Sequence, residues 1–250
     1  MITTVSSQLT YAVDHDSVFS TTLPNEVLDL DRSVRTLDLT HNKVVDIPMD
    51  ISKLINMQRL ILADNLIERL PMNLGKLQSL KVLTLDGNQI TTLPDELGLL
   101  VRLERLSISG NLLTWLPETI GSLRNAVNDR MLEMLCSLAC DVTLQDSNED
   151  YLTMQLLLLN VSNNKLKSLP ESIGSCFSME ELQANGNSIE DLPPSVCNLI
   201  HLKSLCLDNN NVHQMEGFQE FEARRKKKFD KQIDSNVMIG SKGLDEGVDL

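Results

Sequence analysis

The chain has 250 residues, 42% of them hydrophobic, which is enough apolar material for a substantial core. Its formal net charge of −13 favours solubility and disfavours general attraction to nucleic acid or to anionic lipid. The chain does not open with a basic segment followed by a long apolar run, and no stretch of about 18 apolar residues occurs. Its five cysteines form no Cys-x-x-Cys pair. We therefore expect a cytoplasmic protein without a transmembrane segment.

A repeated motif follows a variable N-terminal segment, which we assign to residues 1–22. The pattern Leu-x-x-Leu-x-Leu-x-x-Asn-x-Leu occurs seven times, and five of the six intervals between copies are 23 residues. Its first position falls at Val34, Met57, Leu80, Leu103, Leu156, Met179 and Leu202. This motif at a period of about 20 to 29 residues is typical of leucine-rich repeats. We expect two blocks of repeats, at 23–125 and 156–215.

Each repeat contains the pattern of a short strand followed by a return segment. In the third copy, Leu83 and Leu85 alternate with Thr84 and Asp86, as in a strand with one buried face. After Asn88 the apolar residues recur at spacings of three or four, which predicts a short helical or irregular segment. Because every strand runs in the same direction, the sheet must be parallel. The predicted fold is an α/β leucine-rich repeat solenoid, or horseshoe, with this parallel β-sheet on its concave face and the return segments outside.

Three columns of special residues recur along the repeats. The asparagines are Asn42, Asn65, Asn88, Asn111, Asn164, Asn187 and Asn210, and their amides are expected to satisfy buried backbone groups of neighbouring turns. The prolines, each preceded by an aliphatic residue, are Pro48, Pro71, Pro94, Pro117, Pro170 and Pro193, and they should end the bend after the strand. The glycines are Gly75, Gly98, Gly121 and Gly174, and Cys197 interrupts their column.

One interval between repeats is 53 residues long, which is one period plus 30. The additional residues, 126–155, contain neither an asparagine nor a Leu-Pro pair at the distance that the repeats require. We interpret them as an insertion loop at the edge of the solenoid, and the alternative is a degenerate repeat. Lengthening a connection from about 4 to about 30 residues costs near 2 kcal/mol by loop-closure scaling, which a stacked core tolerates.

The C-terminal tail, residues 216–250, is basic and aromatic in part. It contains seven Lys or Arg and eight Asp or Glu, so nearly all of the net negative charge is expected in the repeat-containing body. Five consecutive basic residues, 224–228, lie between Phe221 and Phe229. A nuclear signal or a lipid contact is disfavoured because acidic residues surround this run. We favour a helix that packs Phe218 and Phe221 against the last repeat.

The return segments, written Leu-Pro-x-x-Ile/Leu-Gly-x-Leu, resemble those of the intracellular Ras-group class of leucine-rich repeat proteins. The runs 37–42, 159–164 and 221–229 resemble plant proteins of this kind. The resemblance implies a non-catalytic cytoplasmic adaptor connected with Ras-type signalling. The chain departs from such relatives in three places, one of which is the insertion described above. It begins Met1-Ile2 where they often begin Met-Gly, so we expect no lipid anchor from this N-terminus. Its seventh repeat passes directly into the tail, which leaves the end of the core poorly capped.

The outward strand residues differ from repeat to repeat, and a concave face of this kind is the usual binding surface of repeat proteins. The candidate partner-binding residues are Asp38, Arg59, Asp86, Arg105, Asn160, Glu181, Gln183 and Asp208. A solvated sheet face would vary in the same way, so both interpretations stay open. Trp115 occupies a column of otherwise polar residues, so its ring should be at least partly exposed. It is either a binding hot spot or a residue covered by the insertion.

The sequence argues against an enzyme. It contains no phosphate-loop spacing, no His-Glu-x-x-His pair and no Gly-x-Ser-x-Gly elbow. We predict no catalytic, cofactor-binding or metal-binding residue. The expected partner is a protein of unknown identity, with a small GTPase or a signalling enzyme as candidates, and not a nucleic acid. The main alternative to an adaptor is a regulatory subunit that modulates a small GTPase, a kinase or a phosphatase.

Overall fold

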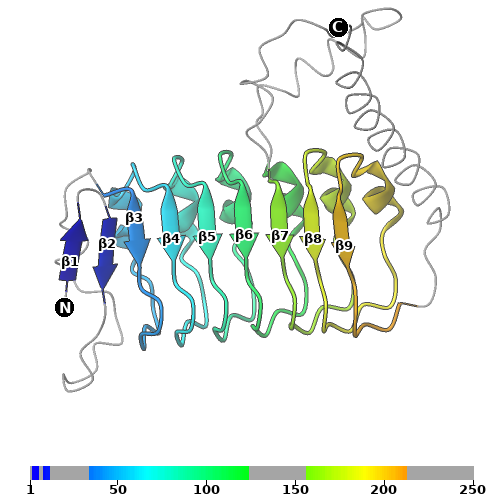
Figure 1. Cartoon of the computed structure of the whole chain (residues 1–250), viewed down its shortest axis with the longest axis horizontal. Helices are drawn as coiled ribbons and strands as arrows, with labels where there is room; N and C mark the ends of the chain where they lie inside the picture. Colours follow the sequence, from blue (N-terminus) through cyan, green and yellow to red (C-terminus); the bar gives the residue numbers. More distant parts are fainter. Residues whose placement is uncertain (1, 6–7, 12–33, 124–155, 213–250) are drawn as a thin grey trace, which may run out of the picture.

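The computed structural model describes residues 2–5, 8–11, 34–123 and 156–212. It shows an open solenoid in which one sheet faces one side and short 3-10 helices lie behind it (Figure 1). The strands, in spatial order, are β1 (Ile2–Val5), β2 (Gln8–Tyr11), β3 (Thr36–Asp38), β4 (Arg59–Ile61), β5 (Val82–Thr84), β6 (Arg105–Ser107), β7 (Leu158–Asn160), β8 (Glu181–Gln183) and β9 (Ser204–Cys206). The predicted leucine-rich repeat solenoid with its parallel sheet is confirmed.

The repeat strands are aligned by one column of leucines. Leu60 pairs with Leu83 and Leu83 pairs with Leu106, so residues one period apart lie side by side. These leucines point inward and are fully buried, whereas their neighbours in the strand face outward. A shift of one residue would turn the whole apolar column toward solvent, so burial fixes the register.

The return segments are 3-10 helices that begin immediately after the proline column. They are η1 (Met49–Lys53), η2 (Met72–Lys76), η3 (Asp95–Leu99), η4 (Glu118–Ser122), η6 (Glu171–Ser175) and η7 (Pro194–Asn198). Pro94, for example, has φ −72° and ψ 145°, which keeps the chain extended until η3 begins. The helix then turns Leu97 inward, where it is fully buried. The predicted short helical returns are confirmed in this 3-10 form.

The glycine column lies where consecutive 3-10 helices touch. A Cβ atom on Gly98 would lie 2.5 Å from the carbonyl oxygen and 2.9 Å from the Cβ of Thr119 in the next helix. The column is filled by Ser52 in the first turn and by Cys197 in η7. No further 3-10 helix follows η7 within the described residues, which explains why a side chain fits at position 197.

We expect Gly98→Ala to lower the free energy of unfolding by about 1 to 3 kcal/mol, the usual range for overpacking a close contact. Because η1 carries Ser52 in the same column and is followed by η2, the fold accepts a side chain at this position, and we do not expect loss of folding. Cys197→Ala, at the same position of the last helix, is the matched control and should change stability little. Urea denaturation of the three proteins measures the difference, and equal stability of all three would contradict the close packing.

Two strands outside the repeats extend the sheet at its N-terminal end. β2 pairs in parallel with β3, and β1 pairs antiparallel with β2, as in a hairpin. Residues 2–11 carry no repeat motif, so the variable N-terminal segment gave no indication of these strands. They cover with backbone hydrogen bonds an edge of β3 that would otherwise be unpaired.

The insertion does not interrupt the stack. β6 pairs directly with β7, with Leu106 opposite Leu159, and the backbone N–H of Ile108 donates to the Asn160 carbonyl at 2.8 Å. This pairing leaves no place between the two strands for the strand of a degenerate repeat. Residues 126–155 themselves lie outside the described residues, so the insertion loop stays a prediction.

We expect that deleting residues 126–155 leaves a folded solenoid that is more stable by up to about 2 kcal/mol, because a shorter loop costs less entropy to close. The observation behind this is the direct pairing of β6 with β7. Melting temperature, compared between the full chain and the deletion variant, is the measurement. An insoluble variant, or one that melts at lower temperature, would mean that the segment is an integral part of the fold.

The core is less closed at its C-terminal end. Leu182 of β8 is fully buried, whereas the corresponding Leu205 of β9 is only partly buried, as are Leu207 and Val212. This agrees with the expectation of an incomplete last repeat. The tail that was predicted to pack there, residues 216–250, lies outside the described residues.

Candidate functional site

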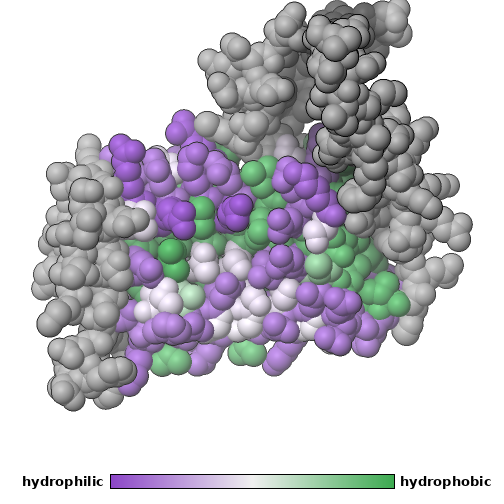
Figure 2. Space-filling view, in the orientation of Figure 1, coloured by the Kyte–Doolittle hydropathy of each residue, from purple (hydrophilic) through white to green (hydrophobic). Residues whose placement is uncertain are grey.

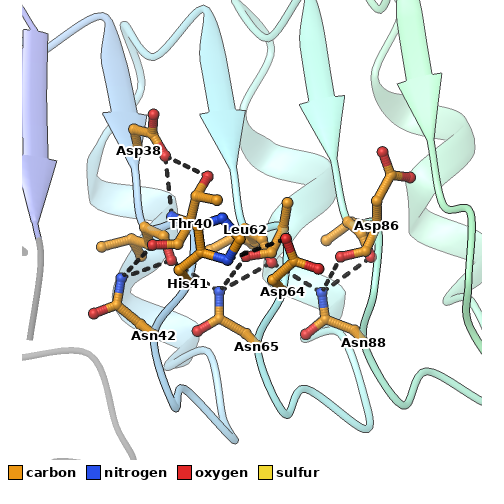
Figure 3. Close-up of polar contacts among 12 residues, drawn as sticks. Asp38, Thr40, His41, Asn42, Leu62, Asp64, Asn65, Asp86 and Asn88 are labelled. Atoms are coloured by element: carbon orange, nitrogen blue, oxygen red, sulfur yellow. Dashed lines mark hydrogen bonds and ion pairs between the residues drawn. The ribbon is translucent and has the colours of Figure 1, made fainter.

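The asparagine column forms a series of side-chain hydrogen bonds to the backbone, here called the asparagine ladder, next to the sheet face. The Asn65 side chain donates through Nδ2 to the carbonyls of Leu39 at 2.8 Å and Leu62 at 3.1 Å, and its Oδ1 accepts the backbone N–H of Val44 at 3.1 Å. Figure 3 shows the amides of Asn42, Asn65 and Asn88 one behind the other along the stack, each donating to backbone carbonyls. Asn88 repeats the bond to the preceding turn, at Leu62, whereas Asn42 donates to Leu39 within its own turn. The ladder joins each turn to the one before it, so the structural role predicted for this column is confirmed.

The residue before each ladder asparagine has a left-handed backbone. The column consists of His41, Asp64, Gly87, Gly110, Asn163, Gly186 and Asn209, with φ between 53° and 65°. Only glycine and short polar residues adopt this conformation at little cost, which explains the composition of the column. The resulting bend follows each strand at the same position of the repeat.

The outward side chains form rows that cross the strands. One row runs from Arg59 through Val82 and Arg105 to Leu158 and Glu181, each residue opposite the next. Arg59 and Arg105 are exposed, whereas the other three are half-buried. In Figure 2, which shows this face, most of the described surface is hydrophilic, with hydrophobic areas between. The structure thus brings three predicted site residues, Arg59, Arg105 and Glu181, into one row.

Two of the predicted carboxylates already have partners inside the fold. Asp86 accepts from the Ser107 hydroxyl at 2.7 Å and from the Ser109 backbone N–H at 2.6 Å. Asp38 accepts from both the hydroxyl and the backbone N–H of Thr40, at 2.7 and 3.0 Å. The Asp86 bonds join two neighbouring turns and the Asp38 bonds lie within one turn, so both carboxylates have a structural use as well as a position on the face.

The remaining predicted polar residues lie on β7, β8 and the end of β9. Asn160 accepts the Ser162 backbone N–H at 3.1 Å, and Gln183 donates to Glu181 at 3.4 Å. Asp208 is exposed at the C-terminal end of the face. Glu181 thus lies in the row of Arg59 and Arg105, two strands beyond Arg105, whereas Asn160, Gln183 and Asp208 lie outside that row.

Ion pairs between neighbouring repeats lie at the N-terminal ends of the strands. Lys81 pairs with Glu104 at 2.8 Å, and Lys203 pairs with Glu180 at the same distance. Both pairs join residues 23 positions apart in the second position of the repeat. These pairs were not among the residues predicted from the sequence, although opposite charges one period apart are the signal that could have identified them.

Trp115 lies outside the sheet face, in the loop before η4. Its side chain is 47% exposed, and Leu112 of the same loop is 37% exposed. The predicted partial exposure is confirmed. Whether the ring contacts a partner or the insertion stays a prediction, because the insertion lies outside the described residues.

The repeats carry less negative charge than the sequence analysis expected. The described residues contain 12 Lys or Arg and 16 Asp or Glu, a net charge of −4 out of −13 for the whole chain. The expectation that the solenoid body holds nearly all of the acidity is therefore wrong for the described repeats. Most of the excess acid belongs to 1–33 and 124–155, which flank or interrupt them.

The described part of the chain contains no group of three or more His, Cys, Asp or Glu side chains placed to hold a metal ion. None of its helices combines the length and the hydrophobicity that crossing a bilayer would require.

Comparison with known proteins agrees with the repeat pattern. Models of the leucine-rich repeat match residues 55–113 and 155–176. A rice protein, Plant intracellular Ras-group-related LRR protein 7, is 59% identical over 54 residues, which are 20% of this chain and 21% of the relative. The chain thus matches about a fifth of that relative. The likeness to the plant Ras-group class is confirmed over this segment. The runs 37–42, 159–164 and 221–229 also predict a finer likeness, to plant forms of leucine-rich repeat-containing protein 57, and this stays a prediction.

Solved structures share the architecture. An LRR protein of Leptospira interrogans is 25% identical with a TM-score of 0.54, over 77% of this chain and 47% of the other. An internalin of Listeria monocytogenes is also 25% identical with a TM-score of 0.54, over 74% of this chain and 43% of the other. In both cases this chain spans less than half of the longer protein.

Proposed function

We propose that this chain, a leucine-rich repeat solenoid similar to plant intracellular Ras-group proteins, is a non-catalytic adaptor of cytoplasmic signalling. It binds a partner protein on the outward face of its sheet. The observation that carries the proposal is a contrast between columns. Leucine occupies the middle of every repeat strand, whereas the outward residues differ in size, charge and polarity. A fixed core that presents a variable face is the design by which repeat proteins bind other proteins.

The exposed arginines support this use of the face. Neither the Arg59 nor the Arg105 guanidinium makes a hydrogen bond or an ion pair within the described part of the chain. Arginine is enriched at protein interfaces because its guanidinium can form several hydrogen bonds in a fixed geometry. Charged groups at an interface set partner choice and association rate more than affinity. Arg59 and Arg105 are therefore the first residues to test.

A regulatory subunit of a small GTPase, a kinase or a phosphatase is the second candidate function. The observation that favours it is the name of the rice relative, which refers to the Ras group. An adaptor and a regulator would use the same face, so they differ in what the partner does when bound. Purified small GTPases recovered with the chain should change their nucleotide hydrolysis rate in the second case only.

We expect that Arg59→Glu combined with Arg105→Glu removes most of the binding to the partner that full-length protein captures from cell extract. Both side chains lie outside the core, so the double variant should melt like the parent. The matched control is Arg69→Glu with Arg102→Glu, which makes the same change of charge at exposed positions off the sheet face. Quantitative comparison of captured partner across the three proteins is the measurement.

Equal capture by all three proteins would move the binding site away from these strands. Loss of capture on removing residues 216–250, with no effect of the arginine changes, would place the site on the tail.

A further inference from the structure

We infer that the partner presents an acidic segment in extended conformation, which crosses β4, β5 and β6 and pairs with Arg59 and Arg105. This inference rests on the proposed function, because it assigns the chemistry of a partner to the same face. It adds the sign of charge, the backbone conformation and the spacing of the residues that are recognised.

The spacing follows from the register of the strands. Arg59 and Arg105 both lie opposite Val82, one on each side of it, so they are two strand separations apart. Adjacent strands are about 4.8 Å apart, which places the two Cα atoms about 10 Å from each other. In an extended chain of the polyproline II type, which has three residues per turn and advances about 3.1 Å per residue, side chains three residues apart lie on the same side and span about this distance. An acidic residue followed by another at the third position along fits the row.

The floor between the arginines is apolar. Val82 is half-buried, and Ile61, also half-buried, follows Arg59 by two residues on the same side of β4. Neither residue offers a hydrogen-bonding side chain to a residue placed above it. A segment whose two acidic residues point toward the arginines would thus lay its intervening residues on an uncharged surface.

The two exposed guanidiniums of this part of the face favour carboxylates as ligands. Asp86 accepts two neutral donors from β6 and the loop after it, and Lys81 is paired with Glu104. The two guanidiniums are the exposed charges on the outward positions of β4, β5 and β6 that have no partner within the described residues. Guanidinium matches a carboxylate through two parallel hydrogen bonds, so a carboxylate is the ligand that uses its geometry best.

The row also sets a limit to the acidic segment. Beyond Arg105 it continues with Leu158, which is half-buried, and then with Glu181. A third carboxylate at that end would approach Glu181, and like charges repel. The recognised sequence should therefore be acidic at two positions three apart and apolar in the next one or two residues on the side of Leu158.

The test is a selection from a library of random twelve-residue peptides on immobilised full-length protein. Three proteins are used in parallel: the parent, the variant Arg59→Glu with Arg105→Glu, and the control Arg69→Glu with Arg102→Glu. We expect peptides enriched on the parent and on the control to carry Asp or Glu pairs spaced by three. A synthetic enriched peptide, followed by fluorescence anisotropy, should bind the sheet-face variant about tenfold or more weakly, because two exposed ion pairs at the upper end of their usual strength correspond to that factor.

The possible outcomes separate this inference from the proposed function. Enriched peptides without acidic residues, or with acidic residues at another spacing, overturn the inference; if they still lose affinity for the sheet-face variant, the proposed function stands. Acidic peptides that bind all three proteins equally overturn both. A selection in which no peptide is enriched overturns the inference, since a short extended segment is then not what the face recognises.

Discussion

Leu83→Ala is expected to lower the free energy of unfolding by about 2 to 5 kcal/mol, the range for truncating a buried leucine to alanine. Leu83 is fully buried in the centre of the stack, between Leu60 of one neighbouring strand and Leu106 of the other. The cavity that the truncated side chain leaves is flanked on both sides by repeats that the asparagine ladder keeps in register. It can therefore collapse only in part, and we expect the upper half of the range.

The position of Leu83 also affects cooperativity. In a repeat protein each unit contacts only its neighbours, so a weakened central repeat can separate the unfolding of the two halves. Urea denaturation followed by circular dichroism should show a lower midpoint and a broader transition than the parent. Thr84→Ala, one residue along on the outward side of the same strand, is the matched control and should change stability by about 0.5 kcal/mol or less. Equal losses at both positions would mean that the assignment of inward and outward faces is wrong.

Much of the fold could be predicted from local pattern. The alternation of Leu83 and Leu85 with polar residues gave the strand, and the 23-residue period gave its parallel neighbours in the correct register. The asparagine and proline columns each correspond to a single backbone requirement, so their position in the sequence defined their place in the turn. The pairing of β6 with β7 followed from the same period, which resumes at Leu156 after the insertion.

The first strands could not be predicted in this way. Residues 2–11 lack the repeat motif, and their pairing with β3 uses backbone groups, which carry no mark in the sequence. The type of return helix was open for a similar reason. Five residues between Pro94 and Leu100 are compatible with either a 3-10 or an irregular segment, and the contact of Gly98 with the next helix favours the tighter form.

The sequence predicted which residues of the candidate site lie on the sheet face. It did not predict which of their side chains already have hydrogen-bond partners within the fold. Asp86 and Arg105 both occupy outward positions, and the repeat pattern does not distinguish between them. In the structure Asp86 accepts hydrogen bonds from the strand 21 residues further on, whereas Arg105 is exposed. The difference depends on the Ser107 hydroxyl of a neighbouring repeat and on a backbone N–H, which are visible only when the strands are side by side. Sequence alone thus selects the face, and geometry selects the free groups on it.

Asn88→Ala should also be strongly destabilising, by about 3 kcal/mol. Its Oδ1 accepts the backbone N–H of Ile67 at 3.0 Å, and its Nδ2 donates to the carbonyls of Leu62 at 2.9 Å and Leu85 at 3.0 Å. The two carbonyls keep a second partner each, from the ladder asparagines Asn65 and Asn111. The Ile67 N–H has Asn88 as its partner and lies in a fully buried residue.

The expected loss follows from this asymmetry. A buried donor left without an acceptor costs about 1 to 3 kcal/mol, and each lost hydrogen bond to a carbonyl that keeps another partner costs about 0.5 to 1.5 kcal/mol. Gln89→Ala removes an exposed amide from the next residue and should have little effect on stability. Hydrogen exchange at the Ile67 amide gives a second readout. This N–H should exchange faster in Asn88→Ala than in the parent, and at the parental rate in Gln89→Ala. If Asn88→Ala kept both the parental stability and the slow exchange of Ile67, the ladder would not be what joins the turns.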